Sequence, residues 1–495
     1  MITDAPLHEA AAPPGELKQK LNLVETVAMS VGLMAPTTGM VFVTSFLASA
    51  AGYNVPLSLV VSTLAVMVIG FCFGRLGRRY AAPGSAYGLA KHALGTRWGL
   101  VAGFGLLFTY GLLVSALLAG TGAFFQVSIR QIFGIDISWG WFAGGAGIVA
   151  LMLAIRDLRP SIRLTLVLET LSMALVLVVC AIIVGHSHLD VTTAIRPFIL
   201  NQHGLPGIAH ALVFGLTTFL GFEGSATLGE KSKDPKRMVP IAVVTSALVG
   251  GIFFVLVSYS QTVGFGLSPK DVADFAGQST PLNTLAQRLV GPGASAAINV
   301  GAAISFFGCL LAALNASSLM LSALSRDGHL PVFLGSARPG TNVPWNAVIL
   351  TAIAGTALTV FGWAMWGDPI QVLGNLSGLA SFGAIVTYGI VCVACLKEYW
   401  REDIADLKRR WFAVLLPLAG LAALVWVLYG NIYPVPAAPI SFFPYIAATF
   451  FAAMITFSEL YRLVARRNAA SVGSASTTIP TAITATDPIT ESSAK

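Results

Sequence analysis

The chain carries a series of apolar runs, each about 20 residues long, that recur between Val27 and Leu463. A helix of that length crosses a hydrocarbon core of roughly 30 Å. Lipid offers no hydrogen-bond partners, so a spanning segment must pair its own backbone N–H and C=O groups, as a helix does. Of the 495 residues, 56% are hydrophobic and only 10% are charged, which is too few to cover a soluble fold. We therefore predict an all-α polytopic membrane protein.

About twelve transmembrane helices account for these runs. The tails, residues 1–20 and 467–495, are rich in Ala, Ser, Thr and Pro and are expected to be disordered. The first 20 residues contain no cleavable apolar segment, so the first span would itself anchor the chain. The predicted spans are 24–48, 57–75, 98–127, 139–155, 164–184, 207–229, 239–263, 295–324, 346–364, 370–396, 412–429 and 442–464.

Basic residues indicate the orientation. If the N-terminus is cytoplasmic and the spans alternate, 25 of the 29 Lys and Arg residues fall inside. Because cytoplasmic loops are enriched in these residues, the asymmetry supports both the number of spans and their direction. We expect a multi-pass protein of the cell inner membrane with both termini cytoplasmic. The net charge of +7 then needs no nucleic-acid partner. The four outside residues are Arg130, Arg196, Lys270 and Arg288.

Two spans are interrupted in matching places. Span 1 contains a proline and two glycines within Ser30–Gly39, and span 6 contains two glycines and an acid within Thr217–Gly224. Counting five spans forward leads from the first interruption to the second. Paired breaks of this kind are typical of an inverted-repeat transporter with a binding site at the midplane. The alternative is that each is a kink or a seam of small residues.

An unwound membrane helix exposes N–H and C=O groups that protein, water or ligand must satisfy. The N–H groups at a half-helix N-terminus attract a carboxylate, and the freed carbonyls can accept an ammonium group or a cation. Two broken helices can therefore bind both ends of an α-amino acid.

Three motifs resemble those of one transporter superfamily. Gly221–Ala242 contains G-F-E, an acidic turn and D-P-K-R-M-V-P. Ala82–Tyr87 reads A-P-G-S-A-Y, and Ser325–Pro331 reads S-R-D-G-H-L-P. Together they resemble the signature of the amino acid–polyamine–organocation superfamily, and the resemblance extends from about residue 18 to 466.

The resemblance implies a ten-helix, 5+5 inverted-repeat core of the leucine-transporter type over residues 21–396. Residues 397–411 would be a cytoplasmic linker or surface helix, and 412–466 would hold two peripheral helices. The substrate carboxylate would meet the backbone of Thr37, Thr38 and Gly39. The ammonium group would meet carbonyls of Met34, Ala35, Phe219 and Leu220, with Phe222 and Glu223 following the break.

Some positions depart from the family pattern. Thr217 stands where arginine and agmatine exchangers carry an aromatic gate, and Leu319 stands where many relatives carry an arginine. Ser172 falls where some proton-coupled relatives place a lysine. These differences favour uptake of a neutral or small substrate over exchange of cationic ones.

Two acids, Glu169 and Glu223, lie deep within spans. Placing a carboxyl group within the membrane costs free energy, so our first hypothesis is that these two residues have a function. We predict that Glu223 takes part in gating or proton coupling. Glu169 is either a second coupling residue or a buried acid paired with a hydroxyl group. A sodium ion near Ser317 and Ser318 is the remaining possibility for coupling.

Other classes of function fit poorly. Gly224–Ser232 nearly matches a phosphate-binding loop, but Glu230 would place an acid beside the phosphate. The histidines between residues 186 and 210 are irregularly spaced and lack cysteine partners, which argues against zinc. Cys392 and Cys395 form a C-x-x-C pair inside an apolar span and are interpreted as packing residues. We expect neither an enzyme nor a metal or cofactor site.

The sequence thus predicts a secondary active permease for amino acids or related amines. Its partners would be the lipid bilayer and a small-molecule substrate. Proton-coupled symport by alternating access is the main hypothesis. An amino acid or amine exchanger on the same fold is the alternative, followed by a sodium-coupled symporter.

Overall fold

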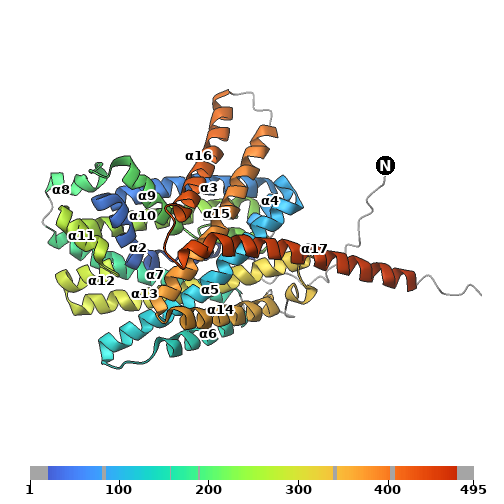
Figure 1. The fold of residues 1–495 in the computed structure, drawn as a ribbon, viewed down its shortest axis with the longest axis horizontal. Helices are drawn as coiled ribbons and strands as arrows, with labels where there is room; N and C mark the ends of the chain where they lie inside the picture. Colours follow the sequence, from blue (N-terminus) through green and yellow to red (C-terminus); the bar gives the residue numbers. More distant parts are fainter. Residues whose placement is uncertain are drawn as a thin grey trace, which may run out of the picture.

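The structure is a computed structural model that describes residues 20–80, 85–156, 158–187, 190–337, 343–401 and 407–475. Every regular element in these ranges is a helix (Figure 1). The long helices lie roughly side by side, as expected for a bundle that crosses a membrane. The all-α fold class is thereby confirmed.

The α-helices begin and end close to the predicted spans. They are α1 (Leu23–Met34), α2 (Pro36–Ala51), α3 (Val55–Tyr80), α4 (Ala86–Leu94), α5 (Thr96–Phe133), α6 (Trp139–Arg156), α7 (Leu158–His186), α8 (Val191–Ile195), α9 (Gly204–Thr217), α10 (Pro235–Phe265), α11 (Pro269–Gly277), α12 (Pro281–Leu285), α13 (Pro292–Arg326), α14 (Trp345–Trp366), α15 (Pro369–Arg401), α16 (Leu407–Ile432) and α17 (Phe443–Ala475). A 3₁₀ helix, η3 (Gly224–Lys231), follows α9 after a turn.

Ten helical runs among the described residues are long and apolar enough to cross a membrane. One of them, Leu23–Tyr80, contains α1, α2 and α3 and so covers the first two predicted spans. Predicted span 6 corresponds to the 14-residue α9 together with η3. Each predicted range therefore coincides with a helix or a broken pair of helices, but helix length alone does not establish a count of twelve.

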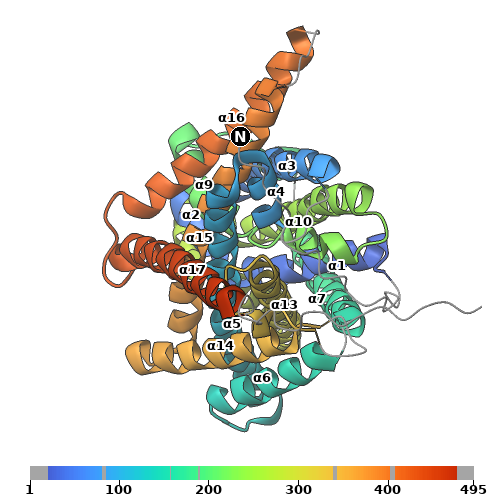
Figure 2. The same ribbon diagram turned by 90° about the vertical axis from the view of Figure 1, so that its right-hand side faces the viewer.

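The core of the bundle consists of α5, α13 and α15. In the most apolar stretch of α5, 83% of the residues are buried, against 17% for α6 and 11% for the α17 stretch. Small residues allow the core helices to approach closely. A Cβ added to Gly105 of α5 would lie 2.9 Å from the carbonyl oxygen of Gly383 in α15. Figure 2 shows α14, α16 and α17 around the outside of this core.

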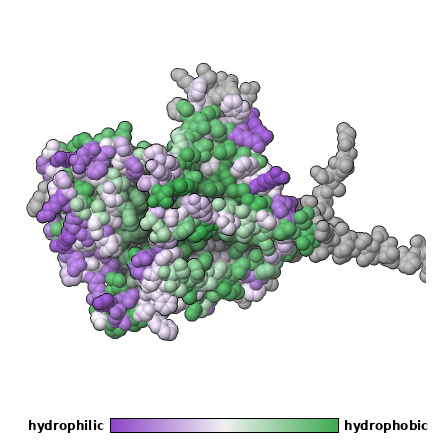
Figure 3. Space-filling model, in the orientation of Figure 1, coloured by the Kyte–Doolittle hydropathy of each residue, from purple (hydrophilic) through white to green (hydrophobic). Residues whose placement is uncertain are grey.

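The distribution of polar surface agrees with long helices that run across a membrane. In Figure 3, hydrophilic residues gather at the left end of the molecule, where Figure 1 places α8, α11 and α12. Hydrophobic surface covers much of the middle. The last turns of α17 lie at the opposite, right-hand end (Figure 1). This arrangement is the one expected if α8, α11 and α12 lie outside the cell.

Two predicted boundaries are corrected by the structure. Residues 397–401 are the end of α15, and residues 407–411 are the start of α16. Both helices extend beyond their apolar stretches into the charged segment that was expected to be a linker. The rest of that segment, 402–406, lies outside the described residues. The helix α17 continues to Ala475, so residues 467–475 of the expected disordered tail are helical. The remaining tail residues, 1–19 and 476–495, lie outside the described part.

The predicted topology can be tested at the segment between η3 and α10. A cysteine in place of the exposed Lys233 should resist a membrane-impermeant maleimide in intact cells and react after the cells are opened, because this segment is expected to be cytoplasmic. Lys270→Cys, in the first turn of α11, is the matched control and should react in intact cells. The five native cysteines are buried and add little background. External labelling at position 233 would contradict the orientation.

Candidate functional site

The first span is broken at Ala35. This residue has a left-handed backbone (φ 46°, ψ 67°) and separates α1 from α2. The cause is Pro36, which has no N–H group and restricts the residue before it. Freed groups at the break find local partners: the Ala35 carbonyl accepts from Thr38 N–H (3.1 Å) and from the Thr38 hydroxyl (2.8 Å).

The two glycines of span 1 are helical and do not form the break. Instead they allow close approach. A Cβ at Gly32 would lie 2.1 Å from Cγ2 of Thr165 in α7, and a Cβ at Gly39 would lie 2.7 Å from Cγ2 of Thr218. The sequence therefore located the interruption correctly but attributed it to more residues than cause it.

The second break follows α9. The helix ends at Thr217, the chain turns through residues 218–223, and η3 begins at Gly224. Gly221 has φ +95°, a conformation that residues with a Cβ rarely adopt. Predicted span 6 is thus interrupted where the sequence indicated.

The two breaks pack directly on each other. A Cβ at Gly221 would lie 2.8 Å from both the carbonyl carbon and the carbonyl oxygen of Leu33, which is two residues before Ala35. The Ser225 N–H donates to the Ser30 hydroxyl at 2.8 Å. The backbone of the 218–225 segment therefore lies directly against α1.

Glu223 lies in the second break and is fully buried. Its carboxyl group accepts hydrogen bonds from the hydroxyls of Tyr110 in α5, at 2.7 Å, and Tyr388 in α15. Both α5 and α15 belong to the central core. The acid thus connects the broken span to two long helices on the opposite side from α1.

Glu169 of α7 is also fully buried and reaches the first break. Its Oε1 accepts from the Thr37 N–H at 3.3 Å, and its Oε2 accepts from the Ser305 hydroxyl of α13 at 2.6 Å. The Cys309 thiol, one turn further along α13, donates to the freed Leu33 carbonyl at 3.2 Å. The two acids therefore lie on either side of the paired breaks, and Glu169 is paired with a hydroxyl.

The predicted substrate-binding residues separate into two groups. Thr38 and Gly39 lie in the first turn of α2, and Thr218 packs on Gly39. In contrast, Thr217, Leu220 and Phe222 line a cavity of about 10 Å³ with residues of α3, α15 and α16. Phe219 packs edge-on against Phe254 of α10 at 4.8 Å, and Met34 packs beside Gly250 of the same helix. The contact of this part of span 6 with α1 is made at Gly221, which packs on Leu33.

The serines considered for sodium lie away from these contacts. Ser317 is within 3.5 Å of the Thr351 hydroxyl of α14, and the Ser318 hydroxyl donates to the Asn315 carbonyl in its own helix. Ser172 donates to the Gly301 carbonyl of α13. The α13 residues that reach the first break are Ser305 and Cys309, about two to three turns nearer the N-terminus of this helix.

Tyr110, Tyr388, Ser305 and Cys309 were not predicted. The tyrosines carry a signal that could have found them, because tyrosine in a membrane helix is concentrated near the interfaces. Both lie near the middle of long apolar helices, where a hydroxyl needs a partner. Ser305 and Cys309 carry no such signal, since small polar residues in membrane helices often bond to their own backbone.

Two family motifs far apart in sequence meet in space. Asp327, which follows α13, accepts hydrogen bonds from the Tyr87 hydroxyl and from Lys91 Nζ at 2.7 Å, both in α4. The preceding motif residues, 82–84, lie outside the described part. The loop after span 2 is thereby joined to the end of span 8.

The model of a protein family described as "Amino acid permease" matches residues 21–457. The chain belongs to the amino acid permease family. The match includes both breaks, both buried acids and all three motifs.

Curated relatives of this permease are transporters. The methylthioribose transporter of Bacillus subtilis is 24% identical, with 83% of this chain and 88% of the relative covered. The low-affinity putrescine importer PlaP of Escherichia coli is 26% identical, with 84% and 89% covered. The branched-chain amino acid permease BcaP of Bacillus subtilis is 25% identical, with 85% and 89% covered. The permease spans most of the length of each.

A solved structure shares the fold. A mutant of the manganese transporter of Eremococcus coleocola superposes with a TM-score of 0.54 at 14% identity, covering 90% of the permease and 95% of that chain. At this identity the likeness concerns the fold alone. The leucine-transporter-like fold class predicted from the sequence is confirmed.

The N-terminal end of α1 is fixed to neighbouring segments. Glu25 closes a capping box with Asn22, and its Oε1 accepts from Arg159 Nε (2.5 Å) and Arg163 Nε (2.7 Å) of α7. The Lys233 N–H donates to the Leu21 carbonyl at 3.1 Å. The start of α1 is therefore bonded to α7 and to the segment before α10.

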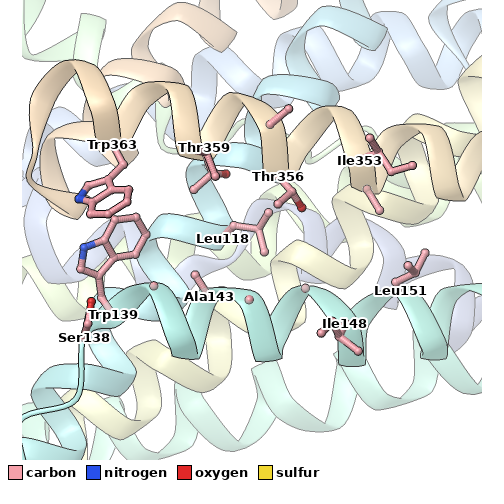
Figure 4. Close-up of a pocket in the computed structure, with 16 residues that line it drawn as sticks. Leu118, Ser138, Trp139, Ala143, Ile148, Leu151, Ile353, Thr356, Thr359 and Trp363 are labelled. Carbon is pink, nitrogen blue, oxygen red and sulfur yellow. The ribbon is translucent and has the colours of Figure 1, made fainter.

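A cavity of about 700 Å³ lies elsewhere, between α6 and α14 (Figure 4). Trp139 and Trp363 face each other at one end of it, and Leu118 of α5 forms part of its floor. None of its lining residues is titratable. It is separate from the paired breaks and lacks the groups that coupling requires.

Proposed function

We propose that this permease is a secondary active transporter that moves an amino acid or a related amine across the inner membrane by alternating access, with no chemical change to the substrate. Both termini would be cytoplasmic and twelve spans would cross the bilayer. The curated relatives support this range of substrates, because their names include a branched-chain amino acid permease and a putrescine importer.

The observation that carries the proposal is the direct packing of two broken spans with a buried acid on each side. Freed backbone groups near Met34, Ala35, Thr37, Thr38 and Gly39 would contact the substrate from span 1. The backbone at Phe219 and Leu220 would contact it from span 6. Since Thr217, Leu220 and Phe222 point toward α3, α15 and α16, their side chains would shape the wall of the site and not touch the ligand.

Proton coupling would use Glu223. An ionised carboxylate accepts from both Tyr110 and Tyr388, whereas a protonated one donates a hydrogen itself, so one of these bonds would reverse its direction or be lost. Each protonation step would therefore alter how span 6 is connected to α5 and α15. Coupling through Glu169, or through a sodium ion, is the alternative.

Uptake into empty proteoliposomes tests the proposal. With an acidic exterior, the permease should accumulate one or more labelled amino acids or amines without any internal substrate. An exchanger on the same fold would require substrate inside, so preloading distinguishes the two. Vesicles that accumulate nothing under a proton gradient, and exchange nothing when preloaded, would contradict the transporter assignment.

A further inference from the structure

The first turn of α2 offers a limited set of hydrogen-bond donors. Pro36 has no N–H, and the Thr38 N–H already donates to the Ala35 carbonyl. The Thr37 N–H is therefore a principal donor through which the positive end of this helix can bind an anion. What occupies that donor determines what the first break can recognise.

In this chain the donor is occupied by the protein itself. Glu169 reaches across from α7 and accepts from Thr37 N–H, and Ser305 holds its other oxygen at 2.6 Å. The Thr37 hydroxyl is fully buried beside this carboxyl. A substrate carboxylate would have to displace Glu169 from the helix N-terminus and then remain next to it.

The buried charges around the breaks are of one sign. Glu169 and Glu223 are fully buried, while no lysine or arginine is buried among the residues whose exposure the structure describes. In a low-dielectric site a carboxylate without a positive partner is strongly disfavoured, and an ammonium group beside a carboxylate is favoured. The electrostatics therefore favour a cation and oppose a second anion.

We propose that Glu169 is the resident anion of the α2 N-terminus, and that the permease selects small organic amines without an α-carboxylate over the corresponding amino acids. This inference rests on the proposed function, because it assumes that the substrate binds between the breaks. Thr217, Leu319 and Ser172 led to the expectation of a neutral or small substrate, and a small amine agrees with the size but not with neutrality. Glu169 acts here as a specificity-determining residue.

Matched pairs that differ only in the carboxylate test the proposal. Putrescine with ornithine, and cadaverine with lysine, are added to the purified permease in detergent, and each affinity is taken from ligand-induced thermal stabilisation. Passive leakage of amines does not affect this measurement. The wild-type permease should bind the amine of each pair about tenfold or more tightly than the amino acid, since a lost charge-assisted hydrogen bond has that effect.

Variants at position 169 distinguish the effect of the Glu169 charge from the effect of its hydrogen bond to the Thr37 N–H group. Glu169→Ala leaves the Thr37 N–H free, so the affinity for the amine relative to the matched amino acid should fall by about tenfold. Glu169→Gln keeps the side-chain volume, so it should weaken amine binding without improving amino acid binding. Ser172→Ala, one turn along α7, is the control and should leave the ratio at its wild-type value.

The outcomes are distinct. A shift of about tenfold toward the amino acid in Glu169→Ala, with the other two variants as described, supports the inference. Preference of the wild-type permease for amino acids, or an unchanged ratio in Glu169→Ala, overturns it and leaves the transporter assignment in place. Failure of both members of every pair to bind, together with absence of transport of any amino acid or amine, would contradict the proposed function itself.

Discussion

Glu223→Gln is expected to abolish accumulation of substrate against a gradient while substrate exchange across the membrane continues. Glutamine resembles the protonated acid in shape and cannot release a proton. It can still accept a hydrogen bond from one of the two tyrosines that Glu223 contacts, so the site should remain assembled. Counterflow requires no net proton movement and should survive.

The measurement is uptake into proteoliposomes under an imposed pH gradient, alongside counterflow in preloaded vesicles. Accumulation by Glu223→Gln should fall to the level of protein-free vesicles, and the pH dependence of its uptake should flatten. Tyr388→Phe removes one donor and leaves the acid in place, so accumulation should be weakened and not lost. If Glu223→Gln still concentrates substrate, coupling would pass to Glu169 or to sodium, and replacing sodium with choline decides between them.

Gly221→Ala should produce the second large effect, the loss of substrate binding. The residue has φ +95°, and a Cβ there would lie 2.7 Å from Leu33 Cγ and 2.8 Å from the Leu33 carbonyl group. A left-handed backbone costs a residue with a Cβ about 1–2 kcal/mol, and the contact with Leu33 backbone cannot be relieved by rotating a side chain. The two breaks would be forced apart, so substrate affinity should fall by about tenfold or more.

Comparison with other glycines makes this prediction specific. Gly145→Ala in α6 is the control, because nothing lies within 4 Å of the added Cβ. Gly39→Val and Gly224→Val should also impair binding, but the first contact at Gly39 is the methyl end of Thr218 and at Gly224 is the end of the Leu33 side chain. Normal binding by Gly221→Ala, at wild-type membrane levels, would show that close packing of the breaks is not needed.

Much of the fold could be predicted because the bilayer imposes it. The length of the apolar runs placed a helix or a broken pair of helices at each predicted range, and Pro36 and Gly221 marked both breaks. The limits of α15, α16 and α17 were wrong, since these helices continue beyond their apolar stretches into charged or small residues. Hydropathy measures what crosses the membrane and not where backbone hydrogen bonding ends.

The candidate site was predictable only in part. Both acids were identified by their depth in apolar spans, but their partners were not. Glu169 contacts Thr37 across 132 residues of sequence, and Ser305 across 136. Such contacts depend on which faces of two helices meet, and helix hydropathy carries little information on this when a helix is apolar all round. For the same reason the direction of Thr217 and Phe222 could not be foreseen.

The central claim is that solute and protons cross together through the paired breaks. Proton movement in proteoliposomes that contain a pH-sensitive dye in their lumen tests it most directly. Addition of a transported amine or amino acid to the outside should acidify the lumen in vesicles with wild-type permease. The same addition should cause no acidification with Glu223→Gln, although counterflow persists. Substrate accumulation by the wild-type permease with no change in luminal pH would contradict the account.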